Sequence, residues 1–129
     1  MAVLIRAFSL LLIVLVAAQP AIADTLTITC QYAASASTEG FEKLRKDFVL
    51  TFIIDKKTNA AYIVGNAGSN PVTVASGSMG QTTFVETTKS GAMQVTVIDR
   101  KLRSAHSRHT IVAPDELLAS QFYGACVVS

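Results

Sequence analysis

The stretch that decides the fold is Gln121-Phe122-Tyr123-Gly124-Ala125-Cys126-Val127, near the end of the chain. We predict it to be the last strand, and its Cys126 is one of only 2 cysteines among 129 residues. The other, Cys30, lies in the predicted first strand. An even number of cysteines in an exported chain is typical of disulfide bonding. We therefore predict a Cys30–Cys126 disulfide that draws the two ends of the domain together.

Residues 1–23 have the organisation of a secretory signal peptide. Arg6 precedes an apolar core from Ala7 to Ala18, and Ala21-Ile22-Ala23 supplies the small residues that a signal peptidase requires. We predict cleavage before Asp24, which leaves one domain, residues 24–129, in the periplasm or outside the cell. The alternative is an uncleaved anchor, but the apolar run is shorter than the roughly 20 residues that span a bilayer. No stable membrane insertion is expected after cleavage.

The charge of the mature domain is nearly balanced. Without Arg6, 10 of the 11 Lys and Arg residues remain against 9 Asp and Glu residues, a net charge of +1. A balance of this kind does not favour a polyanionic partner, so we expect no nucleic acid to bind.

Short segments of β-strand character, separated by tight turns, predict about eight strands, of which 104–112 is unusually polar. These segments are Thr25–Tyr32, Phe48–Asp55, Ala60–Val64, Val72–Ala75, Gln81–Thr87, Ala92–Asp99, Ser104–Val112 and Gln121–Val127. Two other segments are expected to be loops, each with one helical turn: Ala33–Asp47 and Ala113–Ser120. The sequence therefore predicts an all-β antiparallel meander that forms a small barrel or a sandwich, closed by one disulfide.

Residues 100–109 hold the strongest cluster of chemically active side chains, including both histidines. On a strand, His106 and His109 face opposite ways, which is poor geometry for a shared metal ion, so we predict neither a metal nor another cofactor. Two interpretations of the basic residues stay open. They form a solvated bend, or they form an anion-binding patch in which arginines fork onto a carboxylate or phosphate. The patch would consist of Arg103, His106 and Arg108.

His109 has two interpretations of its own. Facing inward, it would be a core histidine whose candidate partners are Tyr32, Tyr123 and Gln121. In a Ser-His-acid hydrolase, it would act with the candidates Ser107 or Ser120 and Asp99 or Asp115. No serine lies in a nucleophile elbow, so we predict no catalytic residues and no enzyme activity.

Two blocks of the sequence carry a first resemblance, Ala105–Thr110 and Ser120–Cys126. Together they resemble the closing half of small secreted β-proteins of alphaproteobacteria, which carry an early cysteine and a late Gly-x-Cys. The resemblance covers most of the mature chain in pattern. It implies export and a β fold rather than an activity.

The overall plan is also similar to the periplasmic inhibitors of c-type lysozyme, small β-barrels that plug a lysozyme cleft with two loops. Ala75-Ser76-Gly77-Ser78 resembles the first loop motif, and Thr87-Thr88-Lys89-Ser90-Gly91 resembles the second. The chain departs from that pattern because the tyrosine after the first motif is absent and Ser90 interrupts the second. The resemblance implies that loops 75–80 and 87–91 bind lysozyme, with Ser76, Ser78 and Lys89 in its cleft.

The leading prediction is a non-enzymatic binding domain, with lysozyme inhibition as its most concrete form. The alternative is a carrier of a small apolar ligand, because a barrel of about eight strands has room for one. Against that alternative, five aromatic residues are expected to be sufficient to fill the interior: Phe48, Phe52, Tyr62, Phe84 and Phe122. An enzyme that uses His109 is the third possibility.

Overall fold

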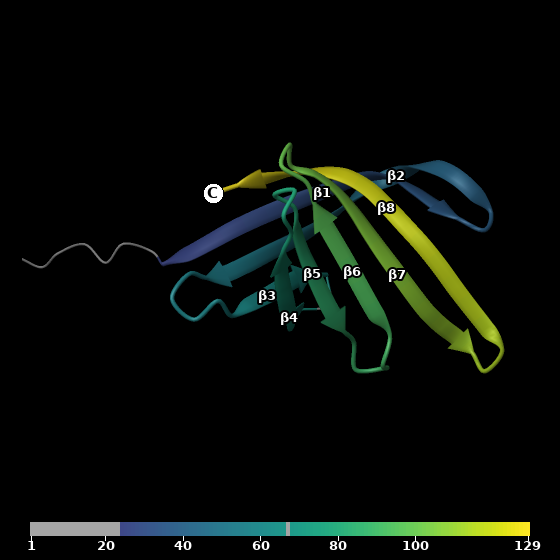
Figure 1. Cartoon of the computed structure of the whole chain (residues 1–129). Helices are drawn as coiled ribbons and strands as arrows, with labels where there is room; N and C mark the ends of the chain where they lie inside the picture. The colour runs from purple at the N-terminus through teal and green to yellow at the C-terminus, as the bar shows by residue number, and fades with distance from the viewer. Residues whose placement is uncertain (1–23, 67) are drawn as a thin grey trace, which may run out of the picture.

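The computed structural model describes residues 24–66 and 68–129, and the predicted signal peptide lies outside them. Eight antiparallel strands follow one another in chain order and the last pairs with the first, so the sheet is a closed barrel (Figure 1). The strands are β1 (Thr25–Ser37), β2 (Gly40–Asp55), β3 (Ala61–Gly65), β4 (Gly68–Ser76), β5 (Thr82–Thr87), β6 (Met93–Ile98), β7 (Arg103–Ala113) and β8 (Glu116–Val128). The all-β prediction is confirmed, and the architecture is a barrel rather than a sandwich.

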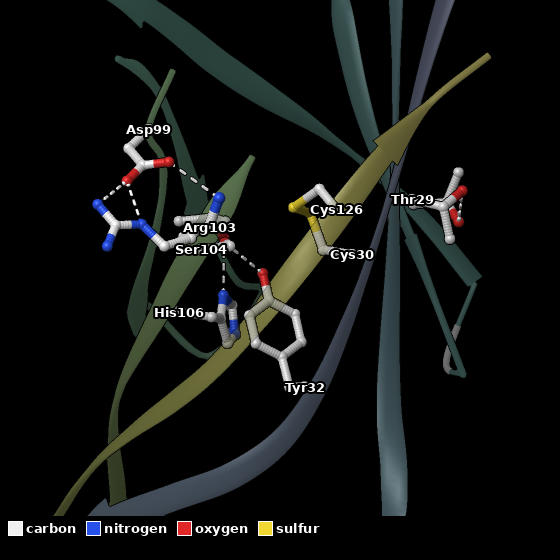
Figure 2. Close-up of a disulfide and its surroundings, with 10 residues drawn as sticks. Thr29, Cys30, Tyr32, Asp99, Arg103, Ser104, His106 and Cys126 are labelled. Carbon is white, nitrogen blue, oxygen red and sulfur yellow. Dashed lines mark hydrogen bonds and ion pairs between the residues drawn. A yellow bond between two sulfur atoms is a disulfide. The ribbon is translucent and has the colours of Figure 1, made fainter. Parts of the chain in front are cut away.

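The seam between β1 and β8 closes the barrel. These strands pair antiparallel (Figure 1), and the register places Cys30 directly opposite Cys126. The two cysteines form a disulfide inside the barrel, across a sequence separation of 96 (Figure 2). The predicted disulfide is therefore confirmed. It joins the two strands that would otherwise be the free edges of the sheet.

The core follows from the alternation of side chains along each strand. The inward positions hold the buried residues Ile28, Cys30, Tyr32, Leu50, Phe52, Ala61, Ile63, Phe84, Ile98 and Cys126. At the centre, the rings of Phe52 and Phe84 stack with centroids 4.1 Å apart. The expectation that Tyr62 helps to fill the interior is wrong, because its neighbours Ala61 and Ile63 take the inward positions and leave Tyr62 45% exposed.

The two segments that were expected to be loops are strands instead. In place of a loop at Ala33–Asp47, β1 continues to Ser37 and β2 starts at Gly40, with an irregularity in pairing between Tyr32 and Ala34. In place of a loop at Ala113–Ser120, Pro114 and Asp115 alone form the turn and β8 starts at Glu116. Each extension continues a hairpin that the barrel has already paired, and these backbone hydrogen bonds override weak helical spacing. The part of the chain described contains no helix long and apolar enough to cross a membrane.

The barrel has two different ends. At one end, here called the mouth, lie the turns that join β1 to β2, β3 to β4, β5 to β6 and β7 to β8. At the other end, the base, lie the remaining turns and both ends of the described chain. Backbone hydrogen bonds secure the base, from Thr27 N to Ser129 O at 3.1 Å and from Lys56 N to Asp24 O at 2.7 Å. The β1–β2 and β7–β8 hairpins are the longest and project beyond the barrel (Figure 1).

Candidate ligand site at the barrel mouth

A cavity of about 700 Å³ occupies the mouth, and we call it the mouth cavity. Its apolar wall comes from Phe48, Leu50 and Ile63. The β2 strand pairs with β3 only from Thr51 to Ile54, so within the described residues no strand pairs on that side with the part of β2 nearer the mouth. Phe48 and Leu50 belong to this part. The cavity thus lies where the wall of the barrel is incomplete.

Polar residues complete the lining of the mouth cavity. They come from the strands that face β2 across the mouth and from the turns between them: Asn66, Asn70, Glu86, Thr88, Lys89, Ser90, Gln94 and Arg108. Among these residues, two are cationic and one is acidic. The cavity therefore combines an apolar wall with a polar rim of net positive charge.

Arg108 is the central charged group of the mouth cavity. Its guanidinium carbon lies 4.4 Å from the centre of the Phe48 ring and 5.0 Å from that of Phe122. Its Nε donates a hydrogen bond to His106 Nε2 at 3.1 Å. Burial lowers the pKa of Arg108, and the charge of Glu86 opposes that effect. A guanidinium remains protonated in proteins, so Arg108 is a cation whose orientation is set by two rings and a histidine.

His106 supports Arg108 from inside the barrel and is fully buried. Its Nδ1 lies 2.7 Å from Thr96 Oγ1. Because Nε2 accepts the hydrogen bond from Arg108, Nδ1 must carry the proton and donate to Thr96. Burial, and secondarily the charge of Arg108, lower the pKa of His106 to about 4. The imidazole is therefore neutral at neutral pH. The ring of Tyr32 lies beside it, with its hydroxyl 2.9 Å from Ser104 Oγ (Figure 2).

Acid should destabilise the barrel through His106. The unfolded state, in which histidine has its ordinary pKa near 6.5, binds a proton that the folded state does not accept until about pH 4. The free energy of unfolding should therefore fall by about 2 to 3 kcal/mol as the pH is lowered from about 6.5 to about 4. Asp55 and Asp99, whose pKa values are held below 3.8 chiefly by backbone hydrogen bonds, titrate below this pH range.

Urea unfolding of wild type and His106→Gln at several pH values measures this effect. We expect the decline between about pH 6.5 and 4 to be largely absent in His106→Gln. The exposed His109 provides the matched control, so His109→Gln should retain the wild-type decline. An equal decline in His106→Gln would contradict the assignment.

Glu86 forms a second polar anchor in the mouth cavity. Its side chain is buried, and its Oε1 accepts a hydrogen bond from Asn70 Nδ2 at 2.9 Å. Sequence reasoning missed this residue, although a signal was present. Glu86 lies two positions after the buried Phe84 on β5, and residues at that spacing share one face of a strand.

The structure does not bring together the three residues of the predicted anion patch. Arg103 is exposed and lies toward the base, where its Nη2 forms an ion pair with Asp99 Oδ2 at 2.6 Å (Figure 2). His106 and Arg108 lie in the interior instead. Alternation explains the separation, because Arg103 occupies an outward position of β7 whereas His106 and Arg108 occupy inward ones.

The two loops that resemble those of lysozyme inhibitors lie at opposite ends of the barrel. Ser76 and Ser78 lie at the β4–β5 connection at the base, and Lys89 lies in the β5–β6 turn at the mouth. The β5 strand separates them, and its six residues span roughly 20 Å at the usual rise. The two loops therefore lie apart rather than side by side.

His109 is exposed on the outside of the barrel, so the core-histidine interpretation is wrong for His109 and applies to His106. With Ser120, it lines a separate hollow of about 330 Å³ between the projecting hairpins. Among the described residues, no hydrogen bond connects His109 to a candidate serine or acid, and no three His, Cys, Asp or Glu residues group as metal ligands.

Comparison of the chain with family models, with curated proteins and with solved structures gave no match in any of the three. Function is therefore inferred from the residues of the mouth cavity.

Proposed function

We propose that this protein is a non-enzymatic carrier, in the periplasm or outside the cell, that binds one small amphipathic molecule in the mouth cavity. The observation that carries the proposal is the cavity itself. A hollow of about 700 Å³ has the size of a small-molecule site, and it joins an apolar wall to a few polar groups. The rest of the interior is packed, so a ligand would enter from the mouth.

The predicted export of the chain and its disulfide support a carrier that works in an oxidising compartment. The disulfide also supports a rigid site, because it holds β1 against β8 and so closes the barrel. Rigid, largely pre-formed sites are typical of small-molecule binding. The contacts of Arg108 with His106 and Phe48 also support a rigid site, because they set the position of the guanidinium before any ligand arrives.

Uptake of the uncharged fluorophore N-phenylnaphthylamine tests the proposal. We expect wild type to bind it, with fluorescence that saturates at one probe per chain. Gln94→Trp should weaken binding about tenfold or more, because the indole would occupy the cavity. Val97→Trp on the outer face of the same strand is the matched control and should bind as wild type does. Equal binding by both variants, or no binding by wild type, would contradict the proposal.

An activity assay of c-type lysozyme distinguishes the proposed carrier from a lysozyme inhibitor. Because the two loops lie at opposite ends of β5, we expect c-type lysozyme to keep its activity in a micromolar excess of the protein. Inhibition that disappears in Lys89→Gln would instead favour a protein partner at the mouth.

A further inference from the structure

We infer that the ligand is an organic anion, with a carboxylate or sulfonate held by Arg108 and an apolar body against Phe48, Leu50 and Ile63. This inference rests on the proposed function and names the chemical class that the mouth cavity would select.

Arg108 has N–H groups that make no hydrogen bond within the described residues. A guanidinium carries five N–H groups, and only the one on Nε is used, by His106. Within the described part of the chain, no hydrogen bond to the two terminal Nη atoms is found. A planar oxyanion accepts two parallel hydrogen bonds from such a group. Since Arg108 lines the mouth cavity, these donors are available to a ligand there.

Among the described residues, Arg108 forms no ion pair. In residues 24–66 and 68–129, ion pairs join only Lys57 to Asp24 and Arg103 to Asp99. A partly buried cation is most stable beside an anion. Glu86 lies in the same cavity and its charge favours the protonated guanidinium, but its hydrogen bond is with Asn70 and it forms no ion pair with Arg108. An anionic ligand would supply the missing partner.

The guanidinium of Arg108 is held in place before a ligand binds. Phe48 and Phe122 lie against it, while His106, itself bound to Thr96, fixes the Nε edge. Pre-organised donors bind more tightly because less side-chain freedom is lost on binding. His106 is therefore a positioning residue that acts through Arg108. Phe48 serves twice, since it contacts the guanidinium and also forms the apolar wall.

A matched pair of fluorescent probes tests the inference. Anilinonaphthalene sulfonate and N-phenylnaphthylamine share one aromatic body, and only the first carries a sulfonate. We expect wild type to bind the sulfonate more tightly than the neutral probe, by about tenfold or more. Arg108→Gln should weaken sulfonate binding more than neutral-probe binding, and so remove this preference. Arg103→Gln is the control, because it removes the same charge from the same strand at the base.

The outcomes separate the two proposals. If wild type binds neither probe, the carrier function is overturned, and this inference with it. Equal binding of both probes by wild type, or a preference that survives in Arg108→Gln, would overturn only the inference. If Arg108→Gln does not fold, Glu86→Gln replaces it, because removing the acidic group should tighten sulfonate binding more than it changes neutral binding. No change in sulfonate affinity in that variant would also count against the inference.

Discussion

Replacement of Cys30 and Cys126 by alanine together should lower the free energy of unfolding by about 4 to 5 kcal/mol. The disulfide closes a loop with a sequence separation of 96, so its loss restores a large conformational freedom to the unfolded chain. A small domain has only about 5 to 15 kcal/mol of net stability, so the variant should be close to unfolding at physiological temperature.

Urea unfolding of the oxidised wild type and the double variant measures this difference. The double variant is preferable to a single one, because a single replacement leaves a reactive thiol that can form mixed disulfides. Wild type unfolded in a reducing agent provides the control and should match the double variant. A difference below about 1 kcal/mol would show that β1–β8 pairing closes the barrel without the covalent bond.

Replacement of Gly124 by alanine should destabilise the barrel by about 3 to 5 kcal/mol. Gly124 lies on β8 opposite Tyr32, beside the irregularity in β1. A Cβ atom there would lie 2.0 Å from the carbonyl oxygen of Gln31 and 2.8 Å from Tyr32 Cα. Both atoms belong to the backbone, so neither can move without opening the seam that the disulfide closes.

Gly65→Ala is the matched control for this prediction. Gly65 also lies in a strand, but a Cβ there would meet only Leu50 Cδ2, at 3.4 Å. The end of a leucine side chain can shift, so we expect a change of less than about 1 kcal/mol. Thermal unfolding of both variants beside wild type gives the comparison. A similar loss in the two variants would indicate a general intolerance of added volume rather than a specific backbone approach.

Alternation made the strands and their inward faces predictable, because the period of a strand is visible in any stretch of sequence. Phe48, Phe52 and Phe84 were expected inside and lie inside. Tyr62 was not distinguishable in this way, since Ala61 and Ile63 on either side of it are also apolar. The hairpin extensions were missed because their residues resemble loops locally. Their strand geometry comes from hydrogen bonds with partners that are already part of the barrel.

Some residues of the mouth cavity were predictable from the sequence, and others were not. Sequence placed His106 and Arg108 on one face of one strand, and the structure has them there, in contact. It also grouped Arg103 with them and offered His109 for the core, because neighbours along the chain cannot be assigned to the inside or the outside of a barrel without knowing its register. Glu86, Phe48 and Gln94 entered the site only through folding.

The all-β class, the number of strands and the disulfide follow from the amino-acid order alone, because these depend on local periodicity and on there being only two cysteines. Folding is needed to bring Phe48 from β2, Glu86 from β5 and Arg108 from β7 to one cavity at the mouth. Folding also places loops 75–80 and 87–91 apart. The physical reason is closure: pairing of β8 with β1 bends the sheet into a ring, which brings distant strands across from one another and separates the two ends of each strand.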